Sequence, residues 1–155
     1  MKIVLIAIPI LMLIAFVGLF VLGFISQSGE ASGLVEARLA ECPDKPNCIC
    51  SEFESDISHY VEPIDFSQSN PGDLLAKLKI IIEEMDGRIQ VENNNYLAAT
   101  FTSSFFRFVD DLEIRIDTDQ KKIQLRSASR VGHGDRGVNK ARIKQLKNLF
   151  QKNIK

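Results

Sequence analysis

The fold is decided by residues 106–130, FRFVDDLEIRIDTDQKKIQLRSASR, whose pattern predicts two strands joined by a turn. From Phe106 to Asp117, apolar and charged residues alternate with the period of two typical of a half-buried strand. The stretch from Lys122 to Arg130 alternates in the same way, and residues 118–121 form the turn between them. We therefore predict an antiparallel hairpin.

The register of this hairpin follows from its aliphatic residues. Pairing Ile116 with Ile123 places both on one face, and the pairing of neighbouring residues then follows automatically. On the opposite face, Glu113 falls opposite Arg126, and Asp111 lies diagonally within reach of Arg126 and Arg130. The sequence thus predicts a ladder of opposite charges. On the aliphatic face, Asp110 falls opposite Ser129.

Helical periodicity flanks the strands. Asn70 and Pro71 are typical of a helix start, and Gly87 is typical of a helix end. Between them, apolar residues recur at three-to-four spacing and predict a buried stripe of Leu74, Leu75, Leu78, Ile81, Ile82 and Met85. From about Arg136 a second helix is expected, with a buried side of Val138, Arg142, Leu146, Leu149 and Phe150 and with Ile143 at its margin.

These elements predict an α+β domain. Strands are also expected near Ile89, from Tyr96 to Thr102 and from His59 to Ile64. We predict an antiparallel sheet of four to five strands, covered on one face by two main helices and preceded by a single N-terminal transmembrane helix. The expected division is residues 1–25 as anchor, 26–40 as tether, with a short helix at Leu34–Leu39, and 41–155 as domain.

The N-terminal segment from Ile3 to Ile25 is uncharged and almost wholly apolar over 23 residues, about the length that crosses a bilayer. A cleaved signal peptide usually has a shorter apolar region, and residues 27–32 are a poor cleavage site, so we favour an uncleaved anchor over a signal peptide. Lys2 precedes the span and acidic residues follow it closely. This predicts a bacterial inner-membrane protein with its N-terminus inside and its domain on the periplasmic side.

Charge is unevenly distributed along the chain. Through Gln120 there are 8 Lys and Arg against 19 Asp and Glu, whereas from Lys121 onward there are 11 against Asp135 alone. Either the basic end neutralises the acidic middle within the domain, which we favour, or it forms a surface for an anionic partner.

Three cysteines lie close together. Cys42 and Cys48 are candidates for a disulfide in an oxidising compartment. Cys50 is then free or competes as partner. Free thiols, or a zinc site completed by His59, are the alternatives, although the spacing matches no standard zinc pattern.

The hairpin also carries the candidate ligand-binding residues. Strand alternation places Asp111 and Glu113 on one face and Asp110 on the other. This arrangement suits structural pairing with arginine better than a three-carboxylate metal site or a catalytic acid–base pair. Guanidinium groups where the last strand meets the final helix would suit a carboxylate or phosphate. The candidate set is Arg107, Asp110, Asp111, Glu113, Arg126, Ser129, Arg130, Asn139 and Arg142. We identify no catalytic residue and no metal site.

Four phenylalanines, at 101, 105, 106 and 108, surround one bend. Packing in the core is the default interpretation, and contact with the bilayer is the alternative.

Spaced motifs in the chain resemble the domain-of-unknown-function family 1499. They are Cys42-Pro-Asp-Lys-Pro-Asn-Cys48, Tyr96-Leu-Ala-Ala, Arg107-Phe-Val-Asp-Asp-Leu-Glu113, Arg126-Ser-Ala-Ser-Arg-Val-Gly132 and Gly137-Val-Asn-Lys-Ala-Arg142. The resemblance covers roughly residues 40–150 and implies a small, often exported or membrane-tethered protein, with no established activity. Cys50 and His133 depart from the family pattern, which argues against a shared chemical role for either.

The leading hypothesis is a non-enzymatic envelope module, anchored in the lipid bilayer through residues 3–25. It would bind an anionic small molecule, a lipid head group or an envelope protein through the region of Arg126 and Arg130. The alternatives are an enzyme acting on an anionic substrate through Asp110 or Asp111, and a purely structural domain whose charges all pair internally. No cofactor and no nucleic-acid partner are expected.

Overall fold

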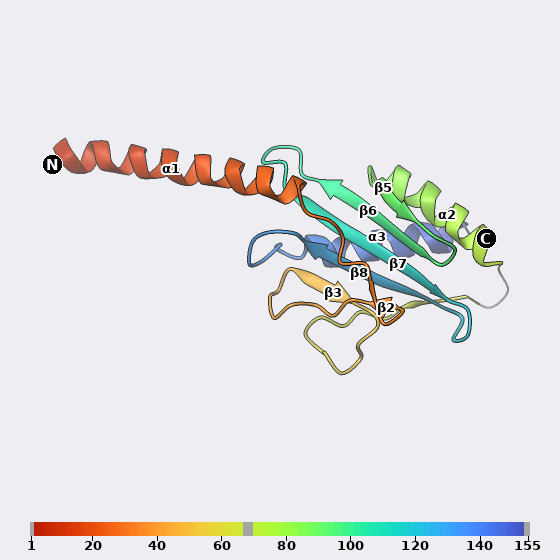
Figure 1. Cartoon of the computed structure of the whole chain (residues 1–155). Helices are drawn as coiled ribbons and strands as arrows, with labels where there is room; N and C mark the ends of the chain where they lie inside the picture. The colour runs from red at the N-terminus through yellow and green to blue at the C-terminus, as the bar shows by residue number, and fades with distance from the viewer. Residues whose placement is uncertain (1, 67–69, 154–155) are drawn as a thin grey trace.

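The computed structural model describes residues 2–66 and 70–153. The first element, α1 (Lys2–Gln27), projects away from the rest of the chain (Figure 1). Its segment Ile6–Gln27 is long and apolar enough to cross a membrane, a property that signal sequences share. The remaining elements form an α+β domain around one main sheet, as the pattern of the sequence predicts.

The main sheet has six strands, against the four to five predicted. The long strands lie in the order β8-β7-β6-β5, and two short strands, β3 and β4, both pair with the outer edge of β8. Neither short strand is long enough to show alternation, so the sequence does not reveal them. The strand expected from His59 to Ile64 only begins at Ile64. All pairs are antiparallel: β3 (Cys48–Cys50), β4 (Ile64–Asp65), β5 (Arg88–Glu92), β6 (Tyr96–Thr102), β7 (Val109–Asp117) and β8 (Lys122–Ser129).

The register of the β7–β8 hairpin is the predicted one. Ile116 pairs with Ile123, and Glu113 pairs with Arg126. Leu112, Ile114, Ile123 and Leu125 are fully buried on one face of the sheet. The charged residues of both strands therefore point mainly to the other face, as alternation requires.

Two helices, α2 (Pro71–Glu84) and α3 (Val138–Asn153), pack on the aliphatic face, where they close the main core. The predicted cap is confirmed, because the Asn70 side chain accepts a hydrogen bond from the amide of Gly72. Two details of the α3 prediction are wrong. Val138 is exposed, and Ile143, expected at the margin, is fully buried.

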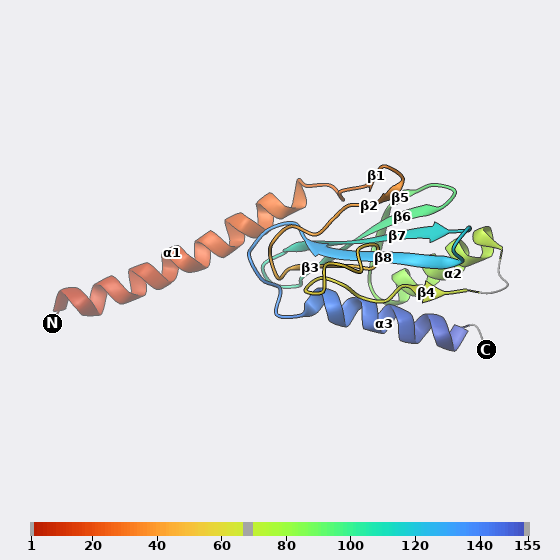
Figure 2. The same cartoon turned by 90° about the horizontal axis from the view of Figure 1, so that it is seen from below.

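Residues 29–40 pack on the other face of the sheet instead of hanging free (Figure 2). They contain a small hairpin of β1 (Leu34–Val35) and β2 (Arg38–Leu39). The short helix expected at Leu34–Leu39 is wrong, because Glu36 and Ala37 have positive φ angles that form a tight turn. Leu39 is fully buried in a second, smaller cluster with Cys50, Tyr96 and Ala98. The sheet is therefore covered on both faces.

Candidate functional site

The predicted charge ladder exists on the face that residues 29–40 cover. Arg130 donates two hydrogen bonds to the Asp111 carboxylate, from Nε at 2.9 Å and from Nη2 at 2.8 Å. On the next rung, Arg126 Nη1 lies 2.5 Å from Glu113 Oε2. Both pairs are largely shielded from water, and each guanidinium group is already paired with a carboxylate.

Glu113 is the centre of this network. It is fully buried and accepts hydrogen bonds from the Tyr96 hydroxyl and from the amide of Gly33, both at 2.8 Å. Burial, with the adjacent Glu113 carboxylate as the next cause, raises the pKa of Tyr96 far above its ordinary value of 10.0. The phenol therefore stays protonated as a donor. Through Gly33, the same carboxylate holds the N-terminal segment onto the sheet.

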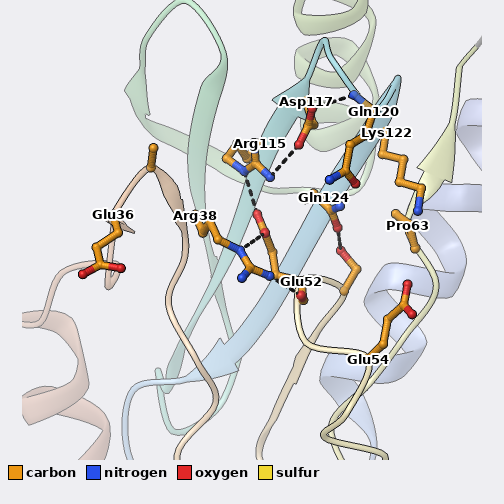
Figure 3. A pocket seen from close by; sticks show the side chains of 12 residues that line it. Glu36, Arg38, Glu52, Glu54, Pro63, Arg115, Asp117, Gln120, Lys122 and Gln124 are labelled. Carbon is orange, nitrogen blue, oxygen red and sulfur yellow. Dashed lines mark hydrogen bonds and ion pairs between the residues drawn. The ribbon is translucent and has the colours of Figure 1, made fainter.

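The ladder continues along β7 into an open polar pocket (Figure 3). Arg115 donates to Glu52 at 2.6 Å and to Asp117 at 3.1 Å, and Arg38 donates to Glu52 at 2.9 Å. Burial alone would raise the pKa of Glu52, but the bonds from the two arginines outweigh it and lower that pKa. In Figure 3, Glu36 points away from this network. Four of the charged residues that line the pocket, Arg38, Glu52, Arg115 and Asp117, thus satisfy one another.

Four more of the predicted residues, Asp110, Ser129, Asn139 and Arg142, lie on the helix-covered face. Arg142 donates to Asp110 at 2.7 Å and to the Ser127 hydroxyl at 2.9 Å. Asn139 also bonds Ser127 and donates to Ser129 at 3.1 Å. This cluster joins the start of α3 to the sheet. The nine predicted residues therefore do not form one site: eight are split between the two faces, and Arg107 lies apart.

Arg107 is exposed, with a positive φ angle, in the connection between β6 and β7. It lines a groove of about 830 Å³, named here the sheet-face groove, which lies between residues 27–34 and the polar face of β5 and β6. Arg88 from β5 lines the same groove, as does Glu30. Among residues 2–66 and 70–153, neither Arg88 nor Arg107 forms an ion pair. Further polar lining comes from Gln27, Ser28, Gln90, Asn93, Thr100 and Thr102.

Cys42 and Cys48 are joined by a disulfide, and Cys50 is a free, buried thiol. Burial raises the pKa of Cys50 from 9.0 to about 11, so the thiol stays protonated and unreactive at neutral pH. His59 bonds Asp56 at 2.7 Å and lies within hydrogen-bond distance of the Lys45 carbonyl, which gives it a role within its own loop.

The end of α1 is built into the domain. The Ser26 hydroxyl donates to the carbonyl of Gly23 at 2.6 Å and accepts from the amide of Val109 at 3.1 Å. Arg130 donates to the carbonyl of Ser26 at 3.2 Å. A side chain at Gly23 would place its Cβ 1.8 Å from the carbonyl oxygen of Phe106, so only glycine permits this approach. The helix is therefore packed against the start of β7.

Several important residues were not predicted from the sequence. Glu52 and Arg38 lie in irregular or very short segments, where no periodicity indicates what they face. The sequence places Tyr96 only in an expected strand and in a motif, and Arg88 only beside the strand expected near Ile89. Their partners are distant in sequence, as in the 63-residue separation of Glu52 from Arg115, and only the fold brings them together.

The sequence model of the family described as "Protein of unknown function (DUF1499)" matches residues 38–150, which is most of the chain. The match covers the sheet, both covering helices and the ladder, and leaves α1 outside. A search of curated proteins finds no match.

Proposed function

The chain belongs to the DUF1499 family, and we propose that it is a single-pass envelope protein with a non-enzymatic domain that binds an anionic group in the sheet-face groove. The anionic group is a phosphate or carboxylate, carried by a lipid head group or by a soluble small molecule. The domain lies on the periplasmic side of the bacterial inner membrane. Lys2 lies before the span and acidic residues follow it, and positively charged flanking residues favour the cytoplasmic side.

The observation that carries the binding proposal is the pair of guanidinium groups at Arg88 and Arg107. They line the groove without an ion-pair partner in the described part of the chain. Arginine binds carboxylate and phosphate groups in a bidentate manner, and a charge-assisted bond contributes about 1.5–3 kcal/mol. Arg130 also lines the groove, but it is bonded to Asp111, as Arg126 is to Glu113, so the proposed anion contacts are Arg88 and Arg107.

Retention of α1 as an anchor is supported by its integration into the fold. Cleavage near residue 25 would remove Gly23, which packs on Phe106, and would disturb Ser26, which bonds Val109 and Arg130. The groove begins at Gln27, directly after the apolar span. An anionic lipid head group is therefore within reach of a domain held in this position.

The test compares Arg88→Gln/Arg107→Gln with the matched control Lys140→Gln/Lys144→Gln, which removes the same charge from the exposed side of α3. The full chain is placed in phosphatidylcholine nanodiscs, and its thermal midpoint is measured with inorganic phosphate or with added phosphatidylglycerol. A ligand that binds only the folded state raises the midpoint.

We expect the wild type and the lysine control to respond, and the arginine variant to lose the response. A response to phosphate identifies a soluble ligand, and a response to phosphatidylglycerol alone identifies a head group. If the wild type responds to neither probe, or the arginine variant responds as the wild type does, the groove is not an anion site.

A purely structural role is the second candidate. It is favoured by the ladder, in which Arg126, Arg130 and Arg115 are each paired with carboxylates. The enzymatic alternative has less support. Asp110 and Asp111, its proposed acid–base groups, are each bonded to an arginine, Asp110 to Arg142 and Asp111 to Arg130, so neither is a free carboxylate facing a pocket.

A further inference from the structure

The connection between β6 and β7, residues 103–108, lies against the membrane-spanning helix, beside its last turns in Figure 1. The Phe106 ring lies 5.7 Å from that of Phe16 and 5.2 Å from that of Phe20, between centroids. The Phe105 ring lies 6.1 and 5.9 Å from the same two rings. Four aromatic rings from segments 85 or more residues apart thus form one cluster, named here the phenylalanine cluster.

The depth of this cluster follows from the position of its helix residues. Phe20 and Phe16 precede Ile25, the end of the apolar run, by five and nine residues. At about 1.5 Å per residue, they lie about 7 and 14 Å along the helix from that end. The hydrocarbon layer of one leaflet is about 15 Å thick. A loop in contact with both rings therefore lies below the head groups whenever α1 spans the membrane.

The loop has the composition that such a position requires. Residues 103–106 carry no charge, and Phe105 is 63% exposed, with its ring unprotected by the domain. Together with Phe16 and Phe20 of α1, which are also exposed, Phe105 forms a contiguous apolar surface of the kind that marks a membrane or protein contact. The first charge is Arg107, which is exposed at the exit of the loop, where a guanidinium group can reach the head groups.

A mainly apolar hollow of about 490 Å³ adjoins the loop on its other side. Its walls include Leu19 and Leu22 from α1, Phe106 and Phe108 from the loop, and Val138 from the start of α3. Leu19 and Leu22 belong to the membrane-spanning segment, so that side of the hollow lies at bilayer depth, whereas Asp110, Asp135 and Arg136 also line it and lie toward the head groups in this arrangement. Lipid chains are the apolar material present there. The exposure of Val138, unexpected from the sequence, then has a physical reason.

We propose that residues 103–106 are a second membrane-inserting element, which enters the periplasmic leaflet beside α1 and fixes the orientation of the domain on the membrane. This inference rests on α1 being retained as the anchor, and it is independent of anion binding in the sheet-face groove. The occupant of the loop surface and of the adjoining hollow is bilayer lipid.

The chain has no tryptophan, so a single substitution gives an unambiguous fluorescent probe. Phe105→Trp places it on the loop and replaces one exposed aromatic ring with another. Leu13→Trp, at a position 62% exposed on α1, is the control for a lipid environment. Ile57→Trp, at a position 89% exposed in the domain, is the control for water. Each full-length variant is reconstituted in nanodiscs with a tryptophan-free scaffold protein, whose lipids carry bromine at mid-chain.

We expect brominated lipid to quench Phe105→Trp nearly as strongly as Leu13→Trp, with a blue-shifted emission, while Ile57→Trp is quenched only by aqueous iodide. If Phe105→Trp behaves as Ile57→Trp does, the loop lies in water and the proposal is overturned. If Leu13→Trp is also unquenched, α1 is not in the bilayer, and both the anchor and the insertion fail. Neither result depends on whether the groove binds an anion.

Discussion

Glu113→Ala is expected to destabilise the domain severely if the ladder is structural. The substitution leaves the Arg126 guanidinium, 4% exposed, without its buried partner, which costs about 3–5 kcal/mol. The hydrogen bond from Tyr96 is lost as well, at about 1 kcal/mol. Because a typical domain is stable by about 5–15 kcal/mol, this is a large part of the total.

Two variants make the measurement specific. Glu113→Leu combined with Arg126→Met removes both charges and should recover most of the loss, because no buried charge is left unpaired. Glu92→Ala breaks the exposed pair between Glu92 of β5 and Lys79 of α2 and should cost at most about 1 kcal/mol. Unfolding by urea in detergent micelles is followed by the fluorescence of the two tyrosines, Tyr60 and the buried Tyr96. If Glu113→Ala costs no more than Glu92→Ala, the ladder does not stabilise the fold.

Three further predictions concern the loops around the ladder. Replacing Cys42 and Cys48 together with serine should lower the free energy of unfolding by about 2–3 kcal/mol, as should reduction of the wild type, in urea titrations. Burial raises the pKa of Cys50 to about 11, so the unfolded chain loses this proton first; stability should fall between pH 9 and 11, and less steeply in Cys50→Ala. Arginine contacts lower the pKa of Glu52 from 4.5, so acidification through that lowered value should destabilise the wild type, and Glu52→Gln should show a shallower pH dependence. A wild-type stability that is flat in either pH range would contradict the corresponding assignment.

The register of the central hairpin could be predicted because it depends only on residues within its two strands and their turn. Ile114, Ile116, Ile123 and Leu125 have only one register that buries them all, and that register fixes the charged rungs. The cap at Asn70 is likewise a short-range interaction. These features need no knowledge of the rest of the chain.

The errors concern segments whose structure depends on distant contacts. Residues 34–39 look like a short helix, but contacts with the sheet, including the burial of Leu39 and the bond from Gly33 to Glu113, stabilise a hairpin instead. The candidate binding residues lie in different places for a related reason. Asp110 and Asp111 are adjacent in sequence, yet alternation places them on opposite faces, with Arg142 and Arg130 as their respective partners.

The central claim is that α1 and the domain form one packed unit at the membrane. Hydrogen exchange of the Val109 amide, which donates to Ser26, reports on this contact in nanodiscs. Gly23→Ala and Gly18→Ala add the same methyl group to the same helix, but only the first meets Phe106, whereas the second meets nothing within 4 Å. We predict faster exchange at Val109 in Gly23→Ala and wild-type exchange in Gly18→Ala. Equal exchange in the two variants would contradict the claim.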